Sequence, residues 1–194
     1  MVGLRLLLAS ANRHKRRELE RALPGWSVDL LPGIAFPEER GATFAENARA
    51  KAELGQAHAP RAWVVGEDSG LEVEALAGRP GIRSARYAGD AASDEENVAK
   101  LLAKLDGVEG DGRRARYVCE LVCLSPGGAE ARARGELAGR IAEAARGSGG
   151  FGYDPVFVPD GETRTVAELG DAWKARHSHR ARAAHALAER VAAL

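Results

Sequence analysis

The sequence predicts an α/β fold built around a mixed β-sheet, and three features point to it. Continuous apolar runs such as Leu4–Ala9 and Trp63–Gly66 are typical of strands buried on both faces of a sheet. Segments with helical start signals lie between such runs, and two apolar stretches joined at Pro126-Gly127-Gly128 are typical of an antiparallel hairpin. Strands and helices in this order indicate α/β or α+β, with a sheet that cannot be purely parallel.

The first half of the chain divides into elements at turn and capping signals. A strand over 4–9 leads through Ser10-Ala11-Asn12 into a helix over 13–23, which Pro24-Gly25 stops. After it we expect a strand over 26–31 and a loop over 32–41 with the acidic pair Glu38-Glu39. A helix then runs from the Thr43–Glu46 capping box to about His58. The next strand, over 63–66, delivers Glu67-Asp68-Ser69-Gly70 to its carboxyl end.

The second half is divided in the same way. We expect extended structure over 71–76, a turn over 78–81, a helix from the Ser93–Glu96 capping box to about Leu105, a surface loop over 106–114, hairpin strands over 115–125 and 129–138, a strand over 156–158 and a final helix from about His179. Because no repeat, linker or low-complexity segment interrupts this order, we expect a single domain over 1–194.

Composition narrows the function classes. Lys and Arg number 28, as do Asp and Glu, so no whole-protein basic field favours long nucleic acid as a partner. No stretch approaches the ~20 apolar residues of a membrane-spanning helix, so we expect no membrane partner. Cys119 and Cys123 lie four residues apart in an apolar run, which is too far for a disulfide within one strand. We therefore expect buried thiols and a reducing, cytoplasmic compartment.

Four segments carry polar side chains suited to chemistry, and the first is Ser10–Lys15. Free backbone amides between a buried strand and the first turn of a helix bind phosphate well, and Lys15 lies one turn after Asn12. The segment has neither a glycine nor a Walker pattern. Asn12 as a simple helix cap and Lys15 as a solvated charge therefore stay open as the alternative.

The second segment is the acidic pair Glu67-Asp68. Adjacent carboxylates beside a buried strand are costly unless a cation meets them, and on a strand their side chains diverge to opposite faces. Magnesium prefers hard oxygen ligands, so Asp68 with a loop acid such as Glu39 would suffice to hold it. An ordinary acidic turn, in which Asp68 bonds its own backbone, is the alternative.

The third and fourth segments could contact a base or an anion. Residues 147–152 match the dinucleotide pattern Gly-x-Gly-x-x-Gly, but they precede an extended stretch instead of opening a helix. We interpret them as a flexible loop that brings Phe151 over a planar base, with Asp154 as an acceptor; a plain turn with a core aromatic is the alternative. Lys174–Arg180 enters the final helix with Ser178 as its cap, where an anion site or a solvated basic turn fits.

Taken together, the four segments resemble the noncanonical purine nucleoside triphosphate pyrophosphatase family, also called the inosine triphosphatase family. The resemblance runs nearly end to end and rests on Leu8–Lys15 with Glu18-Leu19, Thr43–Ala48 with Lys51-Ala52, Glu67–Leu71, Pro80–Gly89, Gly149–Phe157, Ala167–Leu169, Lys174 and Ser178–Arg180. It implies an elongated mixed β-sheet flanked by helices, two lobes with a central substrate cleft, and assembly as a homodimer.

The activity that this resemblance implies is hydrolysis of ITP, dITP and XTP to the monophosphate and pyrophosphate with Mg2+, which cleanses the nucleotide pool. Asp68 would be the general base and, with Glu39, a metal ligand, while Lys15 would stabilise the departing pyrophosphate. The remaining substrate contacts would come from Ser10, Ala11, Asn12, Arg13, His14, Ser69, Phe151, Gly152, Tyr153, Asp154, Lys174, His179 and Arg180. Donors near His179 and Arg180 would recognise a 6-keto oxygen, since adenine's amino group would leave them unpaired.

The chain departs from the family's pattern at Ala11 and Ala181, where glycine is common, and at Glu67, where a second Asp is common. No charge or donor is lost at these positions, so we expect altered kinetics at most. Two other functions stay open: a pyrophosphatase for modified pyrimidine nucleotides, and a noncatalytic nucleotide- or RNA-binding protein.

Overall fold

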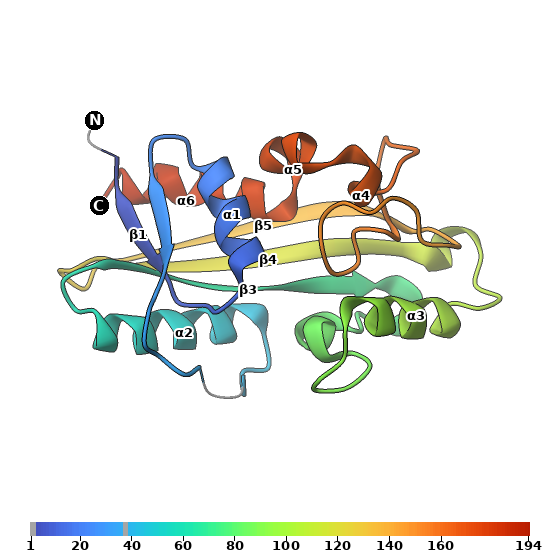
Figure 1. Cartoon of the computed structure of the whole chain (residues 1–194), viewed down its shortest axis with the longest axis horizontal. Coiled ribbons are helices and arrows are strands. Elements are labelled where there is room, and N and C mark those ends of the chain that lie inside the picture. Colours follow the sequence, from blue (N-terminus) through green and yellow to red (C-terminus); the bar gives the residue numbers. More distant parts are fainter. Residues whose placement is uncertain (1–2, 37–38) are drawn as a thin grey trace. The chain divides into compact units, whose positions relative to one another are not determined.

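The computed structural model describes residues 3–36 and 39–194, and it confirms the mixed α/β class. The strands are β1 (Arg5–Leu8), β2 (Ser27–Leu30), β3 (Trp63–Val73), β4 (Arg114–Leu124), β5 (Glu130–Ile141) and β6 (Phe157–Pro159). They form one sheet in the order β2-β1-β3-β4-β5-β6 (Figure 1). β1 is parallel to both β2 and β3, whereas β6 is antiparallel to β5, so the sheet is mixed as predicted.

Four of the helices begin at capping residues that the sequence predicts, Asn12, Thr43, Ser93 and Ser178. They are α1 (Arg13–Ala22), α2 (Phe44–His58), α3 (Asp94–Lys104), α4 (Val166–Leu169), α5 (Asp171–His177) and α6 (His179–Val191), with short 3₁₀ helices at Glu74–Leu76, Gly81–Arg86 and Gly110–Arg113. Ser93 and Glu96 form a complete capping box before α3. Before α2, Thr43 caps the helix, but Glu46 accepts from the amide of Ala42 instead of that of the cap.

Strand β3 differs most from its prediction. The sequence analysis ends the strand at Gly66 and puts Glu67–Gly70 at its carboxyl end, whereas the strand continues to Val73. Burying two acids within a strand is costly, but cations from other elements remove that cost here. Residues 74–76 are a 3₁₀ helix instead of extended structure, and another lies at 110–113 in the predicted surface loop.

Two helices, α4 and α5, were not predicted, and one residue named in the sequence analysis is not described by the structure. α4 and α5 have only four and seven residues, too few to display a helical period in the sequence. Glu38, named with Glu39 in the acidic loop, lies outside the described residues.

The chain divides into two compact units, and β3, β4 and β5 contribute residues to both. Unit 1 contains Met1–Asp68, Cys119–Gly135 and Ala175–Leu194, and unit 2 contains Ser69–Val118 and Glu136–Lys174. The predicted cleft between two lobes stays a prediction.

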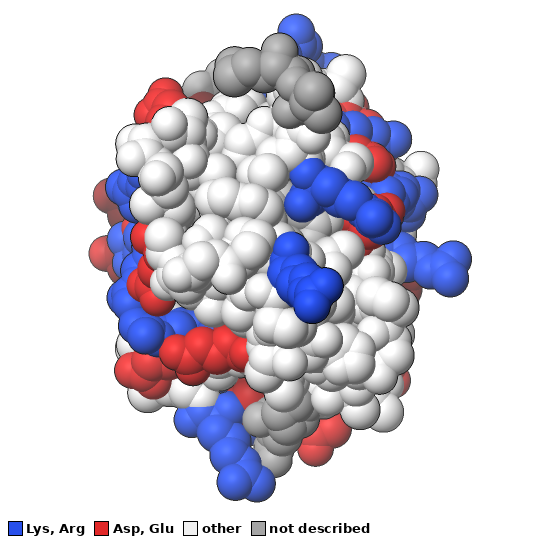
Figure 2. Space-filling model, turned by 90° about the vertical axis from the view of Figure 1, so that its left-hand side faces the viewer, with Lys and Arg blue, Asp and Glu red and all other residues white. Residues whose placement is uncertain are grey.

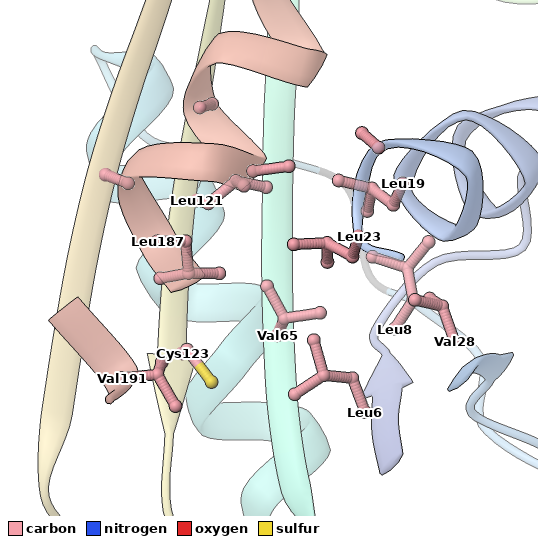
Figure 3. Close-up of a cluster of buried hydrophobic side chains, with 14 of the residues drawn as sticks. Leu6, Leu8, Leu19, Leu23, Val28, Val65, Leu121, Cys123, Leu187 and Val191 are labelled. Carbon is pink, nitrogen blue, oxygen red and sulfur yellow. The ribbon is translucent and has the colours of Figure 1, made fainter. Parts of the chain in front are cut away.

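Each unit has its own hydrophobic core. In unit 1, Leu19 of α1 and Leu187 of α6 pack with Leu8, Val65 and Leu121 from three strands (Figure 3). Also in unit 1, Ala48 and Ala52 of α2 pack with Val122. Because β4 buries neighbouring residues in separate clusters, helices cover both faces of the sheet in this unit. The core of unit 2 joins α3 to the strands through Leu101, Leu105, Leu71, Tyr117 and Phe157.

Candidate active site

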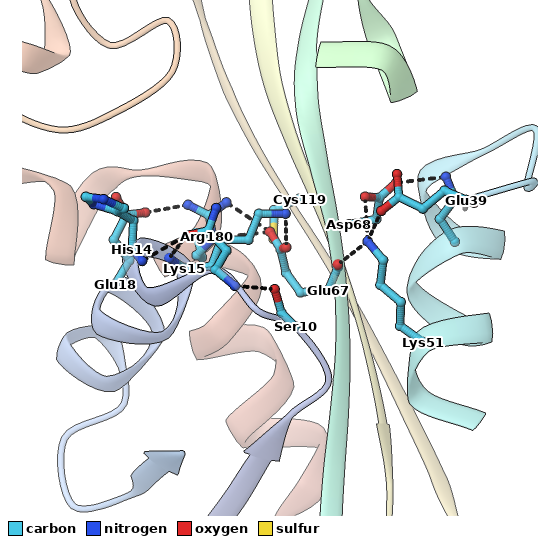
Figure 4. A network of polar contacts seen from close by, with 12 residues as sticks. Ser10, His14, Lys15, Glu18, Glu39, Lys51, Glu67, Asp68, Cys119 and Arg180 are labelled. Carbon is cyan, nitrogen blue, oxygen red and sulfur yellow. Dashed lines mark hydrogen bonds and ion pairs between the residues drawn. The ribbon is translucent and has the colours of Figure 1, made fainter. Parts of the chain in front are cut away.

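Strand β3 carries the two predicted acids on opposite faces of the sheet (Figure 4). Glu67 is fully buried and points toward α1 and α6, whereas Asp68, 4% exposed, points toward α2. This divergence is the one predicted for adjacent residues of a strand. It gives each carboxylate its own set of partners.

Glu67 is surrounded by donors. Lys15 Nζ lies 2.5 Å from its Oε2, and Arg180 Nη2 donates to its Oε1 at 2.9 Å. Burial opposes ionisation, but the charges of Lys15 and Arg180 hold the pKa of Glu67 well below its usual range. Cys119, one of two buried free thiols as predicted, also donates to Oε1. Lys15 is therefore the partner of a buried anion and not a solvated surface charge.

Arg180 links this carboxylate to two helices. It is 2% exposed, and it also donates to Glu18 of α1. Ser178 caps α6 as predicted. The helix approaches β5 at Gly135, where a Cβ atom would lie only 2.1 Å from the carbonyl oxygen of His179. The absence of a side chain at Gly135 thus sets the position of His179 and Arg180.

The predicted phosphate-binding segment, Ser10–Lys15, leads from β1 into α1. Asn12 caps the helix, and its Oδ1 accepts bonds of 2.8 and 3.1 Å from the amides two and three residues ahead. Ser10 Oγ accepts from the amide of Asn12. Within the described part of the chain, the amides of Ala11 and Arg13 donate to no protein acceptor. Capping therefore uses the amides of His14 and Lys15, whereas those of Ala11 and Arg13 remain available to bind an anion.

On the other face of β3, Asp68 contacts α2. Asn47 Nδ2 donates to its Oδ2 and Lys51 Nζ to its Oδ1, each at 3.0 Å. Lys51 also forms an ion pair with Glu39. Burial raises the pKa of Asp68, with the charges of Lys51 and Lys15 acting against the rise. The influence of Lys15 means that the phosphate segment lies within electrostatic reach of this acid.

Asn47 and Lys51 were not predicted as site residues. They stand four residues apart and therefore lie on one face of α2, a spacing that could have marked them as a pair. α2 reaches the strand because Gly66 has no side chain: a Cβ atom there would lie 2.0 Å from the carbonyl oxygen of Ala48. Although burial acts against its charge, Asp68 and Glu39 raise the pKa of Lys51.

The residues on this face fit a divalent cation. Within the described residues, no group of three or more His, Cys, Asp or Glu side chains could hold a metal. Glu39 and Asp68, however, both contact the ammonium of Lys51, so two hard-oxygen donors already converge on one cation. Magnesium is usually held by one or two carboxylates together with water and substrate phosphates. The donor set therefore suits this ion once a polyphosphate supplies the remaining oxygens.

Unit 2 holds the third predicted segment. Asp154, 3% exposed, accepts from Lys174 Nζ at 2.6 Å and from the amide of Phe151 at 3.0 Å, both through Oδ2. Lys174 Nζ also lies 4.8 Å from the centre of the Phe151 ring. The amide of Gly152 donates to Asp94 at the start of α3. The loop expected to be flexible is thus tied at several points.

The structure brings the predicted residues together in two groups. Unit 1 contains Ser10, Ala11, Asn12, Arg13, His14, Lys15, Glu39, Asp68, His179 and Arg180. Unit 2 contains Ser69, Phe151, Gly152, Tyr153, Asp154 and Lys174. His14 contacts Arg17, and Tyr153 donates from its buried hydroxyl to the carbonyl oxygen of Ser84.

Comparison with known proteins gives a consistent result. Residues 6–190 match the model of the Ham1 family. A dITP/XTP pyrophosphatase of Bdellovibrio bacteriovorus is 45% identical, with 97% of this chain and 98% of that protein covered. Another, of Methylococcus capsulatus, is 46% identical with 98% and 97% covered. The solved Ham1 protein of Staphylococcus aureus has a TM-score of 0.84 at 39% identity, with 97% of this chain and 98% of that chain covered.

The family match spans almost the whole chain, and relatives of this identity cover both groups of site residues, in unit 1 and in unit 2. The chain belongs to the Ham1 family.

Proposed function

We propose that the protein hydrolyses noncanonical purine nucleoside triphosphates, dITP, ITP and XTP, to the nucleoside monophosphate and pyrophosphate. The observation that carries the proposal is the pair of adjacent acids on β3. Asp68 is buried, has a raised pKa and accepts from Lys51, and its neighbour Glu67 forms an ion pair with Lys15. Two full-length relatives carry the name dITP/XTP pyrophosphatase, which supports the same activity.

Asp68 is the general base of this proposal. A raised pKa brings a carboxylate closer to neutral pH, where it can accept a proton from an attacking water. Asn47 and Lys51 each bond a different oxygen of the carboxylate and so fix its plane. No covalent nucleophile is required, because hydrolysis of a phosphoanhydride depends mainly on positioning and charge stabilisation.

The phosphate tail would bind at the start of α1. The unpaired amides of Ala11 and Arg13 and the positive end of the helix dipole favour an anion there. Lys15 stands on the same turn with its ammonium held by Glu67, and it would stabilise the charge of the departing pyrophosphate.

We assign Mg2+ as the cofactor, held by Glu39 and Asp68. When bound, it would neutralise phosphate oxygens and so favour attack at phosphorus. The support is the convergence of the two carboxylates on the Lys51 ammonium. Activity that survives exhaustive chelation without added metal would contradict this assignment.

For the base, we assign stacking to Phe151 and recognition of a keto oxygen to the Lys174 ammonium, which lies over that ring. The predicted role of His179, which lies in unit 1, stays a prediction. Arg180 was predicted, with His179, to donate to the keto oxygen, but its guanidinium is bound to the carboxylates of both Glu67 and Glu18. We therefore assign Arg180 a supporting part, through its effect on the position of Glu67.

We also propose that the protein is a homodimer, as the family resemblance implies, and that it is cytoplasmic. Two buried free thiols are compatible with a reducing compartment. Among the described residues, no helix has the length and apolar character needed to cross a membrane. Light scattering that gives the mass of a single chain at micromolar concentration would contradict the dimer.

A noncatalytic RNA-binding function receives little support. Figure 2 shows one face of the molecule, on which Lys and Arg side chains lie among acidic ones and beside a broad uncharged area. Nonspecific binding of nucleic acid relies on a continuous basic surface. A buried acid with a raised pKa has no evident use in such a binder.

The test is a product assay over a panel of triphosphates: dITP, XTP, dATP, dGTP and modified pyrimidine nucleotides. We expect pyrophosphate and monophosphate, fastest from dITP and XTP. Orthophosphate as the sole phosphate product would indicate a terminal phosphatase. A preference for pyrimidines would favour the alternative enzyme, and turnover of none of them would remove the proposal.

A further inference from the structure

A hydroxyl group beside Asp154 has no part in the function proposed above. Asp154 Oδ2 receives both the Lys174 ammonium and the Phe151 amide, at 2.6 and 3.0 Å. Its other oxygen, Oδ1, receives the hydroxyl of Tyr117 at 3.2 Å. The four groups lie in unit 2, and Tyr117 comes from the strand β4.

This hydroxyl acts on the terminal torsion of Asp154. The terminal torsion of an aspartate is broad, so its plane is best fixed when donors hold both carboxylate oxygens. A donor on Oδ1 fixes the plane. Tyr117 is itself held firmly, since it is 7% exposed and its ring lies 4.6 Å from that of Phe157, centre to centre.

The plane of the carboxylate determines where the Lys174 ammonium sits. That ammonium lies 4.8 Å from the centre of the Phe151 ring, so it is placed on one face of the aromatic side chain. A planar base that stacks on Phe151 would meet a donor in a fixed direction. A ring carbonyl can accept from such a donor, whereas an exocyclic amino group cannot.

We propose that Tyr117 is a positioning residue for base recognition: through Asp154 it aligns the Lys174 ammonium with the carbonyl of a 6-keto purine. This rests on the proposed function. Packing does not require the hydroxyl, because phenylalanine would fill the same space against Phe157. What phenylalanine lacks is the donor to Asp154 Oδ1.

The experiment compares Tyr117→Phe with the parent enzyme, using pyrophosphate release from dITP and dATP. We expect KM for dITP to rise about three- to tenfold, the loss that one misaligned hydrogen bond produces, with kcat within about twofold. The kcat/KM for dATP should not change, so the preference for dITP should fall by the same factor. Tyr87→Phe is the matched control, since it removes a tyrosine hydroxyl elsewhere in unit 2 and should change neither constant.

A double-mutant cycle tests the route through Asp154. In an Asp154→Ala background, which removes both acceptor oxygens, Tyr117→Phe should add nothing, whereas additive losses would overturn the proposal. Equal losses for dITP and dATP would also overturn it, because they would indicate general loosening of the loop, and so would an unchanged KM for dITP. Failure of the proposed function has a different signature, since the parent enzyme itself would then release no pyrophosphate from dITP.

Discussion

The two faces of strand β3 make opposite use of neighbouring carboxylates. Glu67 has lost all contact with solvent and Asp68 nearly all, yet the pKa of Glu67 is lowered and that of Asp68 is raised. Glu67 meets two cations, Lys15 and Arg180, at close range. Asp68 meets one cation, Lys51, which it shares with Glu39.

The difference lies in the balance between burial and partner charge. Burial penalises the charged form of both acids. Full compensation turns Glu67 into a permanent anion suited to holding side chains in place. Incomplete compensation leaves Asp68 able to take up a proton, which is what a general base must do. The predictions below test this contrast.

The largest effect is expected on the Asp68 side. Asp68→Asn should lower kcat about 10³-fold, because an amide cannot accept the proton while it preserves the shape of the site. Nucleotide affinity, measured by calorimetry, should stay close to that of the parent enzyme. Turnover near the parent rate would assign the base role to another group and remove the contrast.

On the Glu67 side the main effect should be on stability. Glu67→Gln leaves Lys15 and Arg180 without their shared anion, so urea denaturation at pH 7 should give a loss of about 3–5 kcal/mol. Glu120→Gln is the control: Glu120 pairs with an Arg134 side chain that is 44% exposed, and its loss should cost less than about 1 kcal/mol.

The pH dependence of that stability has a defined sign. A carboxylate with a lowered folded-state pKa contributes stability above its unfolded pKa of about 4.3, and the contribution is lost as pH falls below that value. The Glu67→Gln variant should therefore lose less stability than the parent as pH falls from about 4.3 toward the lower folded-state pKa. Parallel profiles for the two proteins would show that Glu67 is not held as an anion.

An intermediate effect on stability and kcat is expected when a methyl group is added at the two glycines against which α2 and α6 pack. Gly66→Ala would force α2 away from Asp68, and Gly135→Ala would force α6 away from β5, each at about 1–3 kcal/mol of stability. We expect a larger loss of kcat from Gly66→Ala, since it moves Lys51 and Asn47. Gly127→Ala serves as the control, because the added carbon would lie 3.8 Å from Ser125 Oγ, an ordinary van der Waals contact.

The smallest effect should be a shift in a pH profile. The charge of Lys51 lowers the pKa of Asp68, so Lys51→Met should move the acid limb of kcat/KM to higher pH. Arg49→Met removes a cation from the exposed side of the same helix and should leave the limb in place. A shift of the limb to lower pH would reverse the sign of the proposed interaction.

Local sequence signals were sufficient for much of the fold. The Ser93–Glu96 box started α3, the Pro126–Gly128 turn separated β4 from β5, and β1 led through an Asn cap into α1, as predicted. Each of these features depends on residues within a few positions of one another. α4 begins with such a signal, a complete Thr165–Glu168 capping box, yet no helix was predicted there. α5 has only seven residues and was also missed.

The sequence by itself determined which acids stand side by side and that a strand would send them to opposite faces, because side-chain alternation is a local property of the backbone. Only the tertiary structure decided which became the fixed anion. Arg180, 113 residues from Glu67, reaches it across the fold, and Lys51 reaches Asp68 because a glycine lets α2 lie against the strand. A pKa depends on charges in space, and distant segments supply those charges only once the chain has folded.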